Sequence, residues 1–194
     1  MNRIDVMIDI ETLGKTECPP VFQLVAKAFD IQTGEIIDSF HSTCDISTTK
    51  SEIENETVIW WMKTNFKLFV QLLADGVNSG NTEEKMIKDF INWFNDLKGD
   101  ITHKFLWGNG VLFDNRIISA KCRQYGLAYP VYYRNDMDMR TIIEIAAMKL
   151  GFDNQKTYRD SVKFEGTAHD ADCDVDNQIK NIVRAYKDLI KPLK

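Results

Sequence analysis

The chain has few of the features that mark secreted, membrane-bound or disulfide-rich proteins. Its 194 residues include four cysteines, none of them in a C-x-x-C pair, and four prolines. No apolar run approaches the roughly 18 residues of a membrane helix. Asp5 lies where a signal peptide would keep an apolar stretch. These absences argue against a disulfide framework and a cysteine zinc site, and we expect reduced thiols in a cytoplasmic protein without membrane attachment.

The chain also lacks an excess of basic residues, with 24 Lys and Arg against 29 Asp and Glu and a formal net charge of −5. A protein that coats nucleic acid non-specifically would carry a basic face. A nuclease is not excluded, because carboxylates gathered around divalent cations contribute to the negative sum. No repeat, low-complexity tract or linker is evident, so we expect one domain covering residues 1–194.

Hydrophobic periodicity predicts an α/β fold. Strands expected at 3–10, 21–30 and 35–44 would form an antiparallel meander. Helices are expected at 56–65, 82–98, 114–125, 139–150 and 170–190, with strands at 105–107 and 130–134. No element is assigned to 66–81, and 152–168 looks irregular. Asn55, Asn81 and Asp138 are the expected N-caps of three helices. The pattern predicts a mixed β-sheet, an antiparallel meander plus parallel strands, flanked by helices on both faces.

The first candidate motif is the acidic pair Asp9 and Glu11, which follows the apolar run 4–8. Residues i and i+2 of a strand share a face, about 6.5–7 Å apart along it. Two metal ions about 3.5–4 Å apart need oxygen ligands of this kind. A chain with 29 acidic residues can contain such a pair by chance, and two solvated acids are an equally good explanation. Position favours a site, since an unpaired carboxylate in a buried strand is costly.

The second candidate is Asp114, which precedes a predicted helix. Gly108 and Gly110 indicate a tight backbone path, and Asn109 adds a polar group near Phe113. Asp114 could be an ordinary N-cap that accepts hydrogen bonds from backbone amides. Its surroundings and the other motifs favour metal ligation instead.

The third candidate is His169, one of only three histidines, with Asp174 five positions later. Five helical residues differ by roughly 140°, so the two cannot share a face if both are helical. We therefore expect His169 just before the final helix, Asp170 as its N-cap, and Asp174 one turn in. Asp172 and Asp176 would point away and be solvated. A loop histidine bound to the backbone is the plain alternative, but a neutral imidazole near metal ions can deprotonate water near pH 7.

Together these motifs resemble those of the DEDDh 3′–5′ exonucleases, which have an RNase H-like fold. The resemblance covers roughly residues 4–185. Further segments are similar to the exonuclease-VIII-like branch, which includes the phage exonuclease DexA and small bacterial exoribonucleases: Glu11-Thr12-Leu13-Gly14, Ile59-Trp60-Trp61, Trp107-Gly108-Asn109-Gly110, Phe113-Asp114-Asn115, Asn135-Asp136, Asp138, Arg140-Thr141 and Gly166-Thr167-Ala168-His169.

The resemblance implies roles for the five matched residues. Asp9, Glu11, Asp114 and Asp174 would hold two divalent cations, Mg²⁺ or Mn²⁺. His169 would be the general base that activates water.

The resemblance also implies contacts with substrate. The Thr12 backbone would meet the 3′-hydroxyl, and Leu13 would wedge against the last base. Asn109 and Phe113 are further candidate contacts, although core packing explains Phe113 slightly better. At most one residue of the Trp60-Trp61 pair should face the site. A flexible lid or, equally well, a solvated basic loop would include Lys156, Tyr158, Arg159 and Lys163.

We therefore expect a metal-dependent 3′–5′ exonuclease that releases 5′-mononucleotides from nucleic acid 3′ ends, with single-stranded DNA favoured. A 3′–5′ exoribonuclease acting on RNA 3′ overhangs is the alternative, because no residue can be assigned to the 2′-hydroxyl from spacing. An inactive nucleic-acid-binding module is disfavoured because all five positions are filled. A polymerase proofreading subunit is disfavoured because no docking segment is recognised. The expected setting is a bacterial or phage-infected cytoplasm, and the oligomeric state stays open.

Overall fold

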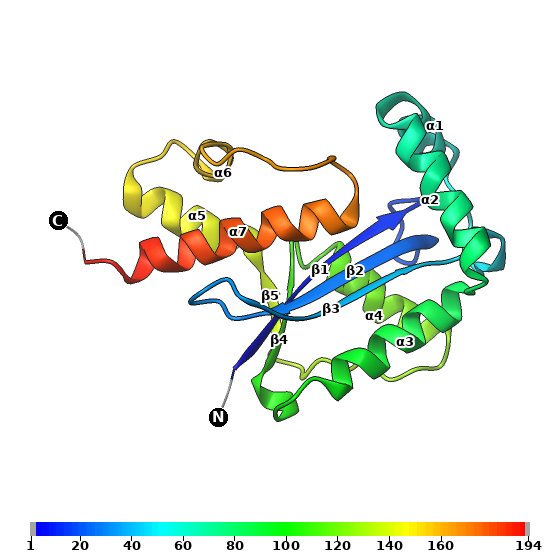
Figure 1. Cartoon of the computed structure of the whole chain (residues 1–194), viewed down its shortest axis with the longest axis horizontal. Coiled ribbons are helices and arrows are strands. Elements are labelled where there is room, and N and C mark those ends of the chain that lie inside the picture. The colour runs from blue at the N-terminus through cyan, green and yellow to red at the C-terminus, as the bar shows by residue number, and fades with distance from the viewer. Residues whose placement is uncertain (1–2, 193–194) are drawn as a thin grey trace.

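A five-stranded sheet with helices on both faces forms the centre of the computed structural model, which describes residues 3–192 (Figure 1). Residues 1–2 and 193–194 of the expected domain lie outside the described part. The strands are β1 (Ile4–Thr12), β2 (Val21–Phe29), β3 (Ile36–Thr43), β4 (Lys104–Gly108) and β5 (Asp136–Asp138). Their order is β3-β2-β1-β4-β5. β1, β2 and β3 pair antiparallel, whereas β4 is parallel to β1 and β5. The predicted mixed sheet is confirmed.

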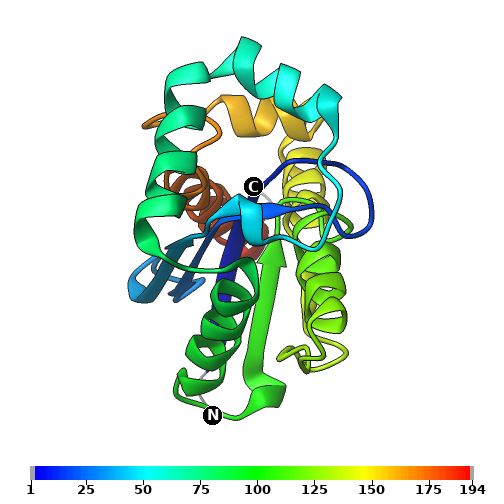
Figure 2. The same ribbon diagram turned by 90° about the vertical axis from the view of Figure 1, so that its right-hand side faces the viewer.

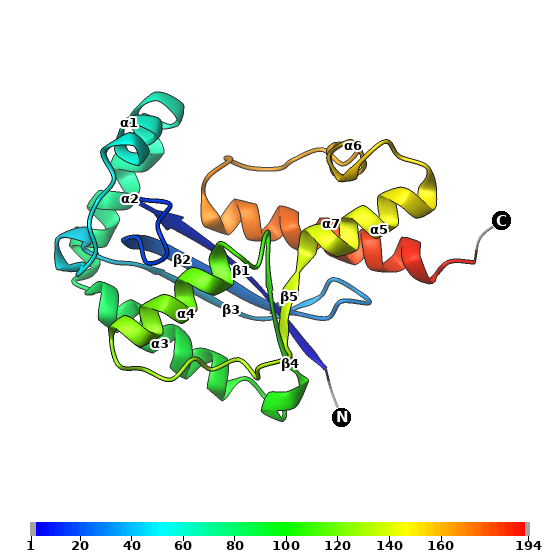
Figure 3. The same cartoon turned by 180° about the vertical axis from the view of Figure 1, so that it is seen from behind.

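The helices form two layers and an outlying pair. They are α1 (Asn55–Thr64), α2 (Phe66–Ser79), α3 (Glu83–Asp96), α4 (Asp114–Gln124), α5 (Met139–Leu150), α6 (Gln155–Asp160) and α7 (Ala171–Ile190), with short 3-10 turns η1 (Ile46–Thr48) and η2 (Ile101–His103). Figure 3 shows α3 and α4 on one side of the sheet and α5, α6 and α7 on the other. Figure 2 views the molecule from the end where α1 and α2 lie. None of the described helices has the length and apolar character needed to cross a membrane.

Alternation along β1 determines which layer each of its side chains joins. Ile8 and Ile10 belong to the core cluster that includes α3 and α4, whereas Met7 belongs to the cluster that includes α5 and α7. Because successive strand residues point to opposite faces, Asp9 and Glu11 share the face of Met7. The acidic pair is therefore directed toward the α7 layer.

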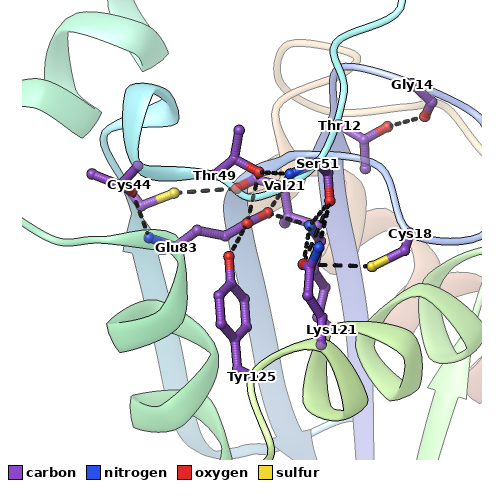
Figure 4. Close-up of polar contacts among 12 residues, drawn as sticks. Thr12, Gly14, Cys18, Val21, Cys44, Thr49, Ser51, Glu83, Lys121 and Tyr125 are labelled. Atoms are coloured by element: carbon purple, nitrogen blue, oxygen red, sulfur yellow. Dashed lines mark hydrogen bonds and ion pairs between the residues drawn. The ribbon is translucent and has the colours of Figure 1, made fainter.

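A buried ion pair joins α3 to α4 on the opposite side of the sheet. Glu83 Oε1 lies 2.8 Å from Lys121 Nζ, and both side chains are fully buried. Glu83 also accepts hydrogen bonds from the Val21 backbone amide at 2.7 Å, the Thr49 hydroxyl at 2.8 Å and the Tyr125 hydroxyl (Figure 4). One carboxylate thus connects β2, the η1 segment, α3 and α4.

Three stretches differ from the elements predicted by the sequence. α2 lies within 66–81, where no element was expected. No strand forms at 130–134. Instead β5 follows Asn135, whose side chain donates to the carbonyls of Thr102 and Lys104 and so places the next residues beside β4. α6 lies within the stretch expected to be irregular, where Asn154 and Thr157 form a capping box.

Two predicted helix caps are displaced by one residue, and a third is confirmed. Glu54, not Asn55, precedes α1, and it makes no side-chain capping bond. Thr82, not Asn81, caps α3 through its hydroxyl. Asp138 caps α5 as expected.

Candidate active site

The four predicted metal ligands and the predicted base meet at the C-terminal end of β1. Asp9 and Glu11 lie on β1, Asp114 is the first residue of α4, and His169 and Asp174 lie just before and within the first turn of α7. In Figure 1 this end of β1 points between α1 and the N-terminal end of α7. All five residues line one cavity of about 360 Å³. The structure therefore brings together side chains that are up to 165 residues apart in sequence.

The chemistry of this cluster fits divalent cations. Glu11, His169 and Asp174 each offer one atom that can bind a metal ion, and these three atoms lie within 4.8 Å of one another. Asp9 and Asp114 line the same cavity. Carboxylate oxygens are the ligands that hard cations such as Mg²⁺ and Mn²⁺ prefer.

The carboxyl groups resist ionisation when no cation is bound. Burial raises the pKa of Asp9 and Glu11 well above the ordinary range, and the neighbouring acids raise it further. Burial raises the pKa of Asp114 to about 7, although backbone amides of Asp114 and Ile10 donate to it and oppose the rise. Burial also raises the pKa of Asp174. Cations in the cavity would reverse this balance because they favour the ionised forms.

These pKa shifts predict how cations change stability with pH. A folded-state pKa above the unfolded value of about 3.9 favours the protonated group, so its contribution is fully present below about pH 4 and lost as pH rises. For Asp114 the loss extends through its pKa of about 7. Cations bind the ionised forms, so we expect Mn²⁺ to raise the melting temperature more at about pH 8 than at about pH 5. Differential scanning fluorimetry in EDTA and in Mn²⁺ measures this, and a larger rise at the lower pH would contradict it.

His169 lies immediately before α7, as the sequence predicts, in a strained conformation. Its φ of 67° is the one positive value outside glycine among residues 3–192. Its backbone amide donates to Asp174 Oδ2 at 2.9 Å, and its ring packs edge-on against Trp60 at a centroid distance of 4.9 Å. Asp170 is the N-cap of α7, also as predicted. Asp174 thus holds the loop that presents the imidazole.

Asp172 and Asp176 point away from the cavity but are not simply solvated, as the sequence led us to expect. Both pair with Lys27 of β2, at 3.0 Å and 2.7 Å. These ion pairs attach the first turns of α7 to the sheet, on the helix face that does not carry Asp174.

The turn from β4 to α4 follows the tight path that its glycines indicate. A Cβ on Gly108 would lie 2.3 Å from Asn115 Oδ1, so no larger residue fits without displacement. Gly110 has a φ of 114° and lies against the guanidinium group of Arg140. This close approach places Asp114 at the edge of the cavity.

Five polar residues of the cavity wall were given no site role by the sequence reasoning: Arg140, Asp160, Asn177, Gln178 and Asn181. The last three lie three, four and seven positions after Asp174, which is the spacing of one helix face. That spacing could have identified them. Arg140 belongs to a segment that carried the family resemblance, but no spacing along the chain linked it to the acids, because α5 brings it to the cavity through tertiary packing.

Asn109 and Phe113 lie in the cavity wall, where the sequence placed substrate contacts. The half-buried Phe113 also lines an adjoining hollow of about 240 Å³. It packs against the core beneath α4 as well, which was its alternative role. Asn109 Oδ1 is buried and has no hydrogen-bond partner in the described part of the chain. Both side chains can therefore contact a molecule in the cavity.

The two residues after the acidic pair, Thr12 and Leu13, are both buried. Thr12 lines the adjoining hollow, and its carbonyl accepts a hydrogen bond from Trp61 Nε1 at 3.2 Å. Leu13 is 3% exposed and packs with Trp61 in a core cluster. The core therefore covers most of the side chain expected to meet a base. Trp60 is 40% exposed at the hollow whereas Trp61 is buried, in keeping with the expectation that at most one faces the site.

Residues 159–168, which we call the strap, are hydrogen-bonded to α7. Asn177 Nδ2 donates to the Glu165 carbonyl at 2.7 Å, and the Glu165 amide donates to Asn177 Oδ1 at 3.0 Å. Of the four residues expected in a lid or basic loop, Arg159 and Lys163 line the cavity, Tyr158 is buried against Asp188, and Lys156 pairs with Asp160.

Comparisons with known proteins agree with this architecture. Residues 4–186 match the family profile described as 3'-5' exoribonuclease Rv2179c-like domain. Curated protein sequences give no match. Cell-death related nuclease 4 (CRN-4) superposes with a TM-score of 0.71 at 14% identity. The nuclease domain of 3'hExo, a DEDDh family member bound to rAMP, gives 0.64 at 16% identity. A zinc-bound complex of E. coli ExoI with single-stranded DNA gives 0.71 at 15% identity.

These structural likenesses show the fold, which is that of RNase H-like exonucleases. They cover 95% of this chain for CRN-4 and 96% for the other two. In return, the chain spans 64% of CRN-4, 92% of the 3'hExo domain and 41% of ExoI. The family profile, in contrast, extends over almost the whole sequence. With this match and the acid cluster in place, the chain belongs to the Rv2179c-like 3'-5' exoribonuclease domain family.

Proposed function

We propose that this protein is a two-metal-ion 3′–5′ exonuclease that releases 5′-mononucleotides from single-stranded 3′ ends. The observation that carries the proposal is the convergence of four carboxylates and His169 in one cavity. The family description supports RNA as a substrate. The DNA-bound ExoI neighbour supports DNA, which the sequence favoured.

Two divalent cations fit the acid cluster. Asp9, Glu11, Asp114 and Asp174 would hold them, and they would supply Lewis-acid stabilisation of charge on the reacting phosphate. The neighbouring ExoI structure with bound zinc supports a divalent cation here. We propose Mg²⁺ or Mn²⁺ because the cluster is rich in carboxylate oxygens.

The chain's own residues would orient water and substrate. His169 lines the cavity beside Asp174 and would accept a proton from the attacking water. Arg140, Arg159 and Lys163 line the same cavity and would bind phosphate oxygens. The positive charges of these three side chains lie on the side of the cavity formed by α5 and the strap, where they partly balance the negative charge of the acids.

The hollow beside the cavity suits the terminal nucleoside. Glu11 and Phe113 line both spaces, so a phosphate among the acids would have its sugar and base next to the hollow. Trp60 offers a half-exposed aromatic face there, and base stacking on such faces is worth about 1–3 kcal/mol.

The assay uses DNA and RNA oligonucleotides of one sequence, labelled at the 5′ end, with a free or a phosphate-blocked 3′ end. We expect ladders that shorten from free 3′ ends, release of 5′-mononucleotides, and no reaction in EDTA. A duplex with a 3′ overhang compares single-stranded with paired ends. Internal cleavage products, or equal degradation of blocked and free 3′ ends, would contradict the proposal.

A further inference from the structure

Gln178 connects α7 directly to the acid cluster. It lies four residues after Asp174, hence on the same helix face. Its Nε2 donates to Asp9 Oδ1 at 2.7 Å. The residue is only 5% exposed and lines the cavity. Its amide is therefore part of the site and not of the solvated helix surface.

The hydrogen bond from Gln178 stabilises the ionised form of Asp9 against the neighbouring acids. Its charge is repelled by Asp114, Asp174 and Asp170. In the described part of the chain, Gln178 is the one side chain that donates a hydrogen bond to any of the four predicted metal ligands. A neutral amide can fix a carboxylate without placing a positive charge where a cation must bind. A carboxylate has about four acceptor positions, so one bond to Gln178 leaves most of them free.

The oxygen of the Gln178 amide lacks a hydrogen-bond partner from the described chain, so we expect one from within the cavity. Gln178 Oε1 is buried and has no hydrogen-bond partner within residues 3–192. When Asp9 is ionised, as cation binding requires, reversing the amide would place Oε1 against one of its oxygens and bring two acceptors into contact. Asp9 therefore determines that the acceptor faces away from it. A buried amide oxygen without a partner is costly, and water is the donor that this cavity can supply.

We propose that Gln178 is a positioning residue for cation binding. Its Nε2 holds the Asp9 carboxylate in one orientation, and its Oε1 accepts a hydrogen bond from water that accompanies a bound cation. The inference rests on the proposed function, because it assigns cations to the acid cluster. Outer residues that orient a metal ligand typically change metal affinity about 10- to 100-fold.

The test is Gln178→Met, which keeps side-chain length but removes both ends of the amide. Mn²⁺ affinity is measured by isothermal titration calorimetry on protein without nucleic acid. We expect the affinity to fall about 10- to 100-fold. With oligonucleotide, activity should fall at limiting Mn²⁺ and recover at saturating Mn²⁺, with KM for the oligonucleotide unchanged.

Asn181→Leu is the matched control. Asn181 is also buried in the cavity wall, one turn further along α7, and its Oδ1 likewise has no partner within residues 3–192. Its amide nitrogen, however, donates to the Asn177 carbonyl of its own helix and not to a predicted metal ligand. We expect Mn²⁺ affinity close to that of the native protein. Melting temperatures in EDTA show whether each variant folds. If Gln178→Met does not fold, Gln178→Asn replaces it, because the shorter amide does not reach Asp9.

Unchanged Mn²⁺ affinity in a folded Gln178 variant would overturn the inference, as would an equal loss in Asn181→Leu. The calorimetric result does not depend on catalysis. A Gln178 variant with weakened Mn²⁺ binding, in a protein that shortens no oligonucleotide, would support the positioning role and reject the proposed function. If the native protein shortens oligonucleotides but the Gln178 variant binds Mn²⁺ normally, the proposed function would be supported and the positioning role rejected.

Discussion

Asp9→Asn is expected to abolish exonuclease activity while making the metal-free protein more stable. The substitution keeps the shape of the side chain and an oxygen that can accept the Gln178 hydrogen bond. It removes the charge that a cation requires. Loss of several kcal/mol of transition-state stabilisation corresponds to a fall in kcat of about 10³-fold or more.

The gain in stability follows from the surroundings of Asp9. Burial and the nearby charges of Asp114 and Asp174 raise its pKa, so holding it ionised at neutral pH costs folding free energy. A neutral amide at this position carries no such cost. In EDTA at about pH 8 the melting temperature of Asp9→Asn should therefore exceed that of the native protein.

Two further variants make the comparison specific. Asp176→Asn makes the same chemical change on α7, at an acid that pairs with Lys27 outside the cavity, and should keep native activity. His169→Ala should lose about 10²- to 10⁴-fold, the usual contribution of a general base. If Asp9→Asn kept activity within tenfold of the native enzyme, or lost stability in EDTA, the assigned role of Asp9 would be wrong.

The second large effect concerns stability, not catalysis. Lys121→Met should destabilise the protein by about 3–5 kcal/mol, because it leaves the buried Glu83 carboxylate without its ion partner. The charge would then be supported only by the neutral donors Val21, Thr49 and Tyr125. Urea denaturation followed by circular dichroism measures the change.

Lys85→Met is the matched control, since Lys85 forms an exposed ion pair with Asp89 on the outer side of α3. Exposed pairs of this spacing contribute about 0.3–0.5 kcal/mol. Adding Glu83→Gln to Lys121→Met should recover part of the loss, because the two residues interact directly. Similar losses for Lys121→Met and Lys85→Met would show that the buried pair contributes no more than a surface pair.

Much of the site could be predicted from sequence because its geometry is local. Strand alternation places Asp9 and Glu11 on one face, and helix geometry separates Asp174 from Asp172 and Asp176. The same spacing also reaches Gln178. These relations depend only on the regular repeat of one element. Bringing the three segments together required the resemblance to a known family as well as the expected topology.

What the sequence could not predict depends on contacts between distant segments. β5 has only three residues, Asp136, Met137 and Asp138, and it forms because the Asn135 amide and β4 hold it in register. A strand with a single apolar residue is too short for a hydrophobic period to be detected. α2 has exposed apolar residues, including Phe66 and Val70, alongside buried ones, which blurs the helical stripe. Lys27 attracts Asp172 and Asp176 across the sheet, a relation that no spacing along the chain contains.

The order in which the site is assembled has a consequence for the cell that makes the protein. Asp9 and Glu11 emerge first from the ribosome, whereas His169 and Asp174 emerge after every strand and six of the described helices. A domain generally folds as a unit, so the site is complete only after its last helix has been synthesised. A nascent chain that ends at α6 carries three of the acids but no base and no Gln178. Under the proposed function, such a chain would shorten no nucleic acid until α7 packs beside β1 and completes the cavity.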